Sequence, residues 1–192
     1  MKKFLLLATV LVFCISGCGS SNGGGTTFYK TVNATVSVDS EKNPLFSDLA
    51  KWADINTSCN GVQVPTNTSD LVNFTITTVK SISSGTASNL MLQKATIVFT
   101  PADTLSPALP AQYATSYIDL FGLSVPADGS VAVPVEVVTH NLKSYFYPTA
   151  VCRNVPVYSY NVQVSFDAIE AGTGKSGTIT AGMTVRIADF AD

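Results

Sequence analysis

The side chains of this chain that can take part in the most kinds of reaction are a single histidine, His140, and four cysteines, Cys14, Cys18, Cys59 and Cys152. A thiol can take a lipid, form a disulfide, bind a metal or attack a substrate, and an imidazole can act as acid, base or metal ligand. None of the cysteines belongs to a Cys-x-x-Cys-His haem-attachment motif. The chemistry open to each residue therefore depends on where the surrounding segments place it.

The first two cysteines lie in an N-terminal segment with the composition of an export signal. Met1-Lys2-Lys3 is basic, and residues 4–13 form an apolar run broken only by a threonine. As a helix this run would be about 15 Å long, half of the ~30 Å apolar core of a bilayer, so it fits a signal peptide better than a transmembrane helix. It leads into Ile15-Ser16-Gly17-Cys18, which resembles the lipobox of bacterial lipoproteins.

The resemblance implies that residues 1–17 are a signal peptide and that Cys18, the first residue of the mature chain, carries diacylglycerol. The alternative is an ordinary signal peptide cut near Gly17, which leaves Cys18 as a plain thiol. Because two or three acyl chains hold a protein on a bilayer for long times, we expect a lipid-anchored protein of the cell envelope. Gly19, rather than aspartate, follows the cysteine, and this favours the outer membrane if the cell is Gram-negative.

Residues 18–27 are predicted to hold the lipidated cysteine and a flexible tether, and residues 28–192 to form the folded domain. The tether is rich in glycine, serine and threonine, and a coil of this length spans roughly 15–18 Å. We expect the domain to stay close to the membrane and to reorient freely.

Cys59 and Cys152 are predicted to form a disulfide, since two thiols outside the cytoplasm most simply pair with each other. They follow the first and the fifth predicted strands, and loops after odd-numbered strands lie at one end if the strands alternate in direction. The bridge would close a loop of roughly 90 residues and contribute about 4–5 kcal/mol in the chain-entropy account. A redox-active pair is the alternative, although nothing nearby indicates the lowered thiol pKa that it needs.

The remaining polar groups form no pattern that predicts catalysis. The sequence lacks P-loop and His-Glu-x-x-His motifs. His140 follows an apolar strand and is expected to be a surface histidine in a loop. Asp167, Glu170, Asp189 and Asp192 are oxygen donors of the kind that calcium prefers, but their spacing favours solvated carboxylates. We therefore expect no enzyme, no cofactor and no metal.

A group of aromatic residues near Cys152 is the candidate binding surface. Tyr145, Tyr147 and Tyr158 lie close in sequence to Arg153, and tyrosine and arginine are enriched at interfaces. If exposed, this patch would bind an envelope protein or a glycan. If buried, it would cover the end of the domain beside the disulfide, and this second interpretation is preferred.

Apolar and polar residues alternate along most of the chain after Tyr29, and a period of two is typical of strands with one buried face. It also indicates antiparallel sheets, because buried parallel strands read as unbroken apolar runs. The clear segments are 32–38, 72–77, 94–99, 131–137, 160–168 and 178–187. A weaker strand is expected within 117–125, and Pro134 predicts that its own strand lies at a sheet edge or carries a bulge.

Other segments do not alternate. Residues 43–53 are either a short helix begun by Asn43-Pro44 or an extended crossing that places Trp52 in the core. Residues 101–114 contain three prolines and predict an extended connection. Residues 53–70 and 141–156 predict long loops.

The strand pattern predicts an all-β fold, a two-sheet antiparallel β-sandwich of about seven strands. Tyr160-Asn161-Val162-Gln163-Val164 resembles the Tyr-x-Val-x-Val run of immunoglobulin- and fibronectin type III-like domains, and a glycine-rich turn at 170–175 and a final strand follow it. The resemblance covers roughly thirty residues and implies that the Tyr160 hydroxyl bonds nearby backbone. Closed barrels and jelly rolls are the alternatives.

The charge of the chain limits the classes of partner that it is expected to bind. The chain has 11 Lys and Arg against 13 Asp and Glu, and proteins that bind nucleic acid usually carry a basic patch, so we expect no nucleic-acid partner. We predict a membrane-anchored lipoprotein whose domain is a non-enzymatic structural or protein-binding module; the alternative is a carbohydrate- or small-ligand-binding lipoprotein. A pocket lined by converging polar groups would favour a ligand, and a contiguous apolar patch would favour a protein partner.

Overall fold

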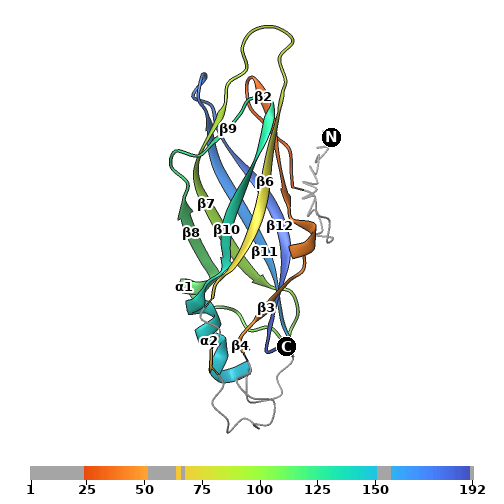
Figure 1. The fold of residues 1–192 in the computed structure, drawn as a ribbon, viewed down its shortest axis with the longest axis vertical. Coiled ribbons are helices and arrows are strands. Elements are labelled where there is room, and N and C mark those ends of the chain that lie inside the picture. The colour runs from red at the N-terminus through yellow and green to blue at the C-terminus, as the bar shows by residue number, and fades with distance from the viewer. Residues whose placement is uncertain (1–23, 52–63, 66–67, 151–156, 191–192) are drawn as a thin grey trace, which may run out of the picture.

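The computed structural model describes residues 24–51, 64–65, 68–150 and 157–190. These residues form an elongated β-sandwich with two main sheets and two helices at one end (Figure 1). Cys18, Cys59, Cys152, Arg153 and Trp52 lie outside the described residues. The disulfide and the placement of Trp52 therefore stay predictions.

The first sheet has the strand order β1-β2-β6-β10, and all of its pairs are antiparallel. Its strands are β1 (Thr27–Phe28), β2 (Val32–Val38), β6 (Asp70–Lys80) and β10 (Gly129–Val138).

The second sheet has the order β3-β12-β11-β7-β8, and β9 also pairs with β7. Its strands are β3 (Leu45–Asp48), β7 (Leu90–Pro101), β8 (Thr115–Asp119), β9 (Ser124–Val125), β11 (Tyr158–Glu170) and β12 (Ser176–Ala188). A separate small ribbon pairs β4 (Ala50–Lys51) with β5 (Val64–Pro65).

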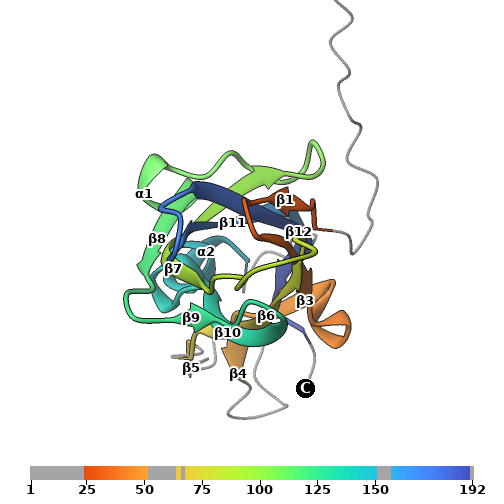
Figure 2. The same ribbon diagram turned by 90° about the horizontal axis from the view of Figure 1, so that it is seen from above.

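The predicted all-β sandwich is confirmed, with ten strands in the two main sheets of the described residues rather than about seven. Each clearly alternating segment forms a strand, and β2 has the predicted bounds 32–38. The inward residues of both sheets form one core, in which the rings of Phe74 and Phe166 lie 5.6 Å apart across the two layers. Figure 2 looks along the strands and shows the layers on either side of this core.

The weaker segment 117–125 is two short strands instead of one. Gly122 lies between β8 and β9 with a φ of +87°, a left-handed conformation that ends an extended strand and that glycine adopts without strain. The antiparallel prediction holds for these strands but not for β3, which pairs with β12 in parallel.

Residues 45–48 form a strand, so the helical interpretation of 43–53 is wrong there. Leu45 and Ser47 are buried while Phe46 is exposed, and the backbone of the segment pairs with Val185–Ala188 of β12. Main-chain partners in a neighbouring strand outweigh a weak local preference for helix.

The expected loop beginning at residue 141 is wrong as far as Ala150, because helix α2 (His140–Ala150) occupies this segment. Thr139 caps the helix, accepting a hydrogen bond on Oγ1 from the Leu142 amide at 3.2 Å. Leu142 and Phe146, one turn apart, are both buried. A second helix, α1 (Ala111–Ala114), and a 3-10 turn at Ser40–Lys42 interrupt the connections elsewhere.

The prediction from Pro134 is confirmed, because β10 is an edge strand that pairs with β6 alone among the described strands. The other sheet ends on the same side of the sandwich with β8. Two sheet edges therefore face each other there, and α1 and α2 lie at the same end of the gap (Figure 1).

Candidate functional site

A pocket of about 470 Å³ opens between the edge strands β8 and β10, next to α1 and α2. Ligand pockets commonly have volumes of about 300–1,000 Å³, so this one is large enough for a small molecule. The ten described residues that line it are Phe99, Gln112, Tyr113, Ser116, Glu136, Val137, Thr139, His140, Asn141 and Leu142.

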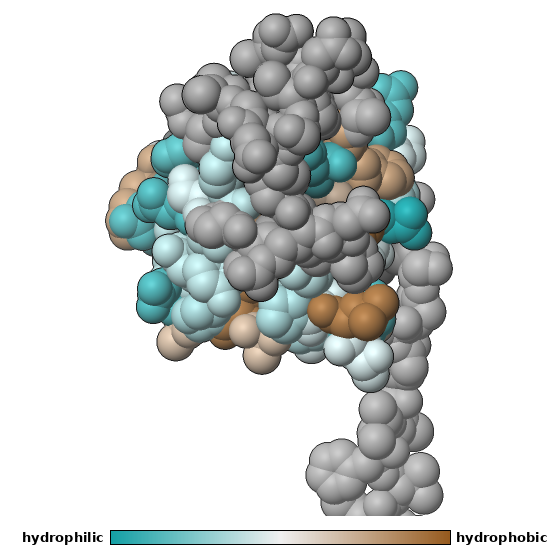
Figure 3. Space-filling model, turned by 90° about the horizontal axis from the view of Figure 1, so that it is seen from below, coloured by the Kyte–Doolittle hydropathy of each residue, from teal (hydrophilic) through white to brown (hydrophobic). Residues whose placement is uncertain are grey.

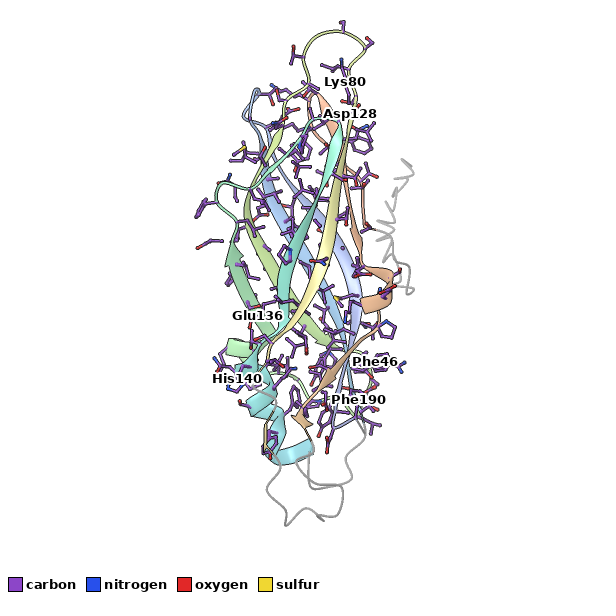
Figure 4. The ribbon with its side chains drawn as sticks, in the orientation of Figure 1. Phe46, Lys80, Asp128, Glu136, His140 and Phe190 are labelled. Atoms are coloured by element: carbon purple, nitrogen blue, oxygen red, sulfur yellow. The ribbon has the colours of Figure 1, made fainter. Side chains whose placement is uncertain are left out.

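The pocket has an apolar base and a polar surround. Phe99, Val137 and Leu142 are buried core residues, whereas Gln112 and Asn141 are exposed. Glu136 on β10 and His140 on α2 lie on the same side of the sandwich (Figure 4). The lining therefore offers both an apolar contact and several hydrogen-bonding groups to a ligand.

His140 begins α2, so the expectation that it lies in a loop is wrong, and its side chain is half-buried at the surface. Its backbone amide donates to Ser69 Oγ at 3.2 Å, and its Nε2 atom lies 3.4 Å from Ser144 Oγ. Its Nδ1 atom is buried and has no hydrogen-bond partner within the described part of the chain. This atom is covered by other protein atoms, so it is not part of the surface that a ligand would meet.

The predicted aromatic patch lies beside the pocket. The Tyr145 ring lies 5.1 Å from that of Tyr113, which lines the pocket, and 5.2 Å from that of Phe146. Phe146 is fully buried, and its ring lies 5.2 Å from the ring of Tyr158.

The predicted surface residues are thus mainly part of the packing at this end of the sandwich. Tyr145 is 39% exposed, and Tyr147 and Tyr158 are half-buried against the core. Figure 3 looks onto this end: the described surface is mostly pale, and its most hydrophobic residues are set apart from one another. The structure brings Tyr145 and Tyr158 together through Phe146, while Arg153 lies outside the described residues.

A buried ion pair fixes α2 to the first sheet. Lys143 is only 2% exposed, and its Nζ donates to Asp70 Oδ1 of β6 at 2.9 Å. The second carboxylate oxygen of Asp70 is buried and has no hydrogen-bond partner in the described ranges. The charge on Lys143 is therefore matched by one contact, and the pair places the first turns of the helix beside the pocket.

Tyr160 fixes the segment that leads to α1. Its hydroxyl donates to the Pro107 carbonyl at 2.8 Å, and burial raises the pKa of this tyrosine above its usual value. Ser106 accepts from the Ser159 amide at 2.7 Å and donates to Asp103 Oδ1 at 2.8 Å. The resemblance to fibronectin-like domains implied a bond from Tyr160 to nearby backbone; the acceptor lies in the connection that follows β7.

The carboxylates considered for calcium do not come together. Glu170 ends β11, whereas Asp189 follows β12 at the opposite end of the same hairpin. Asp167 accepts from Thr178 Oγ1 at 2.8 Å, and Asp192 lies outside the described residues. Within the residues that the structure describes, three or more potential metal-binding side chains are nowhere grouped.

Sequence reasoning missed Gln112, Glu136 and Asn141 as site residues. They come from three elements and have no common spacing, so only the approach of β8 to β10 puts them around one pocket.

Comparison with known proteins gives no further guide to the site. No family model, no curated protein and no solved structure matches this chain. Among the described helices, none has the length and apolar character needed to span a bilayer.

Proposed function

We propose that this chain is a lipid-anchored protein of the cell envelope, and that its sandwich domain is a non-enzymatic binding module that holds a small ligand at the pocket between β8 and β10. The pocket is the observation that supports a ligand. The sequence analysis took a pocket lined by converging polar groups as the feature that would favour a ligand. In this pocket, polar side chains from α1, β8, β10 and α2 converge on one opening.

A protein that adds a strand to the β10 edge is a poorer candidate. The Asn73 carbonyl accepts from the Asp39 amide at 3.2 Å, so the backbone of Asn73 faces β2. Pro134 stands opposite Asn73 in the register, and its own backbone therefore faces the free edge. An added strand would meet a residue with no N–H to donate, which is a common protection of edges.

Exposed apolar residues give little support to a protein partner. The most exposed are Phe28 on β1, Leu71 on β6, Leu105 in the connection after β7, Tyr117 on β8 and Phe121 in the β8–β9 turn. They are distributed over strands and connections of both sheets. Single exposed apolar residues of this kind are normal on protein surfaces.

The arrangement of His140 favours binding over hydrolysis. Serine hydrolases need a nucleophile that bonds the imidazole and a carboxylate that orients it. In the described residues neither Ser116 nor Glu136 hydrogen-bonds His140, whose Nε2 faces Ser144 on its own helix. The three side chains share a pocket without forming a catalytic relay.

The entry point of the chain is compatible with an anchor that leaves the pocket free. The Gly25 amide donates to the Thr180 carbonyl at 3.2 Å, and Thr27 Oγ1 donates to the Thr178 carbonyl at 2.7 Å. The chain thus joins the sandwich along β12, across the molecule from β8 and β10 (Figure 2). A tether from Cys18 would therefore join the domain on a different side from the pocket and would leave the pocket uncovered.

The anchor is tested by mass spectrometry of the N-terminal peptide from native membranes. We expect a mature chain that begins at Cys18 and carries a diacylglycerol thioether, and a Cys18→Ala variant that leaves the membrane fraction. Cys14→Ala is the matched control and should keep the lipid. A mature chain with a free thiol at Cys18 contradicts the proposal.

A further inference from the structure

We infer that the pocket between β8 and β10 binds a neutral saccharide of one or two pyranose rings, an inference that rests on the proposal that the domain is a binding module. The lining residues of the pocket carry the argument through their charge, their aromatic rings and their hydrogen-bonding capacity.

The charge of the lining argues against an anionic ligand. Among the ten described lining residues none is lysine or arginine, and Glu136 alone carries a formal charge. A phosphate, sulfate or carboxylate ligand would face this carboxylate, and none of the described lining residues supplies a cation to balance it. The described lining therefore favours a neutral or positive ligand.

The polar lining fits hydroxyl groups better than it fits a cation. Gln112 and Asn141 each offer a carbonyl acceptor and an NH₂ donor, and Ser116, Thr139 and Tyr113 offer hydroxyls. Adjacent hydroxyls on a sugar ring are both donors and acceptors, so they can engage such groups in pairs. A tetraalkylammonium ion has no hydrogen-bonding group and would leave these side chains without partners, which costs affinity.

The aromatic residues provide the other half of saccharide recognition. Phe99 forms part of the buried base, whereas Tyr113 lines the pocket with a ring that is supported by the Tyr145 ring at a centroid distance of 5.1 Å. A pyranose ring presents C–H groups on its faces and hydroxyls around its rim. Aromatic faces with a negative quadrupole suit the C–H groups, while the polar residues suit the rim.

The test uses the full-length lipidated chain in a polyoxyethylene detergent, because glucoside and maltoside detergents carry sugar headgroups. Saturation-transfer NMR and titration calorimetry are run with glucose, galactose, N-acetylglucosamine, maltose and cellobiose, and separately with tetramethylammonium and with phosphate. We expect at least one sugar to bind with a Kd on the order of 1 mM or lower.

Paired variants assign the binding to this pocket. Gln112→Ala and Asn141→Ala remove exposed lining residues and should each weaken the sugar about tenfold, the loss of one or two hydrogen bonds. Gln163→Ala and Asn161→Ala change the same residue types on the exposed face of β11 and should leave the affinity unchanged. Thermal unfolding of all four variants checks that each is folded.

The outcomes separate this inference from the proposed function. Binding of tetramethylammonium in place of every sugar overturns the saccharide and keeps the binding module. The absence of binding by all five sugars, or sugar binding that the two pocket variants do not weaken, overturns the assignment while the lipid at Cys18 is unaffected. Conversion of a bound sugar supports the saccharide site and overturns the non-enzymatic part of the proposed function.

Discussion

The two ends of the sandwich treat a buried carboxylate in opposite ways. At the hairpin end, defined by the β1–β2 turn and the β11–β12 turn, the fully buried Glu170 accepts from the amides of Lys30 and Thr31 at 3.2 and 2.7 Å. The hydroxyls of Thr31 and Thr173 also donate to it. At the helical end, formed by α1 and α2, Asp70 Oδ2 is buried without a partner in the described residues. Single unmet atoms occur at both ends, because the Tyr29 hydroxyl in the β1–β2 turn and His140 Nδ1 also lack a partner there.

The difference separates a structural site from a candidate binding site. A buried carboxylate with four donors holds loops together and leaves nothing for a ligand to satisfy. Asp70, with its unmet carboxylate oxygen, lies at the end that holds the 470 Å³ pocket, and an unmet buried atom lowers the stability of the isolated domain. We therefore expect the hairpin end to be stable on its own and the helical end to gain stability from its ligand.

The largest expected loss of stability comes from a substitution at the helical end. Phe146→Ala removes a fully buried ring that joins α2 to the core, and it should lower the free energy of unfolding by about 4 kcal/mol. Denaturant unfolding measures the loss. Phe146→Leu retains most of the volume and should cost less than about 1.5 kcal/mol. Similar stabilities for the two variants would show that α2 contributes little to the fold.

The next effect concerns the buried ion pair. Lys143→Met leaves the Asp70 carboxylate without its cation and should destabilise the fold by about 3 kcal/mol, because an unpaired charge remains partly buried. The matched control is Lys94→Met, which breaks an exposed pair with Asp167 at 3.8 Å and should cost less than about 1 kcal/mol. If both substitutions cost the same by denaturant unfolding, burial of the Lys143 pair has no energetic role.

A smaller effect is expected at the hairpin end. Glu170→Gln replaces an acceptor of several hydrogen bonds with an amide that cannot accept all of them, and should cost about 2 kcal/mol at neutral pH. Hydrogen exchange should then show faster opening of the β1–β2 and β11–β12 turns with little change in α2. Equal acceleration at both ends would mean that the two ends open together.

The Glu170→Gln variant also tests how the stability of the fold depends on pH. Burial raises the pKa of the Glu170 carboxyl, but the hydrogen bonds from Thr173, Thr31 and Lys30 outweigh it and leave the pKa below its usual value. The carboxylate therefore stabilises the fold above the unfolded pKa of about 4.3, and this stability is lost as the pH falls through the folded pKa. Acid unfolding of the wild type should be steeper below about pH 4 than that of Glu170→Gln.

The smallest effect tests the support of α1. Tyr160→Phe removes the hydroxyl that bonds the Pro107 carbonyl and should cost about 1 kcal/mol. Tyr117→Phe, on an exposed tyrosine of β8, should change the stability negligibly. A thermal shift as large for Tyr117→Phe as for Tyr160→Phe would exclude a specific role for the Tyr160 bond.

Local sequence patterns were sufficient where the physical cause is local. Alternation in 32–38 and 160–168 predicted both the strands and their buried faces, because successive residues of any strand point to opposite sides. The missing N–H of Pro134 was enough to predict an edge or a bulge. The helix at 140–150 was missed because its short buried stripe lies among tyrosines and a proline, residues with little helix preference.

The sequence by itself determined the class of fold and the inward face of each main strand, and it alone supports the predicted export signal behind the proposed anchor. Each of these depends on neighbouring residues along the chain. Only the tertiary structure decided the parallel pairing of β3 with β12, the complete set of donors around Glu170, and the gathering of Gln112, Glu136 and Asn141 at one opening. These features join segments that are distant in sequence, and their partners are set by packing of the two sheets rather than by any local spacing.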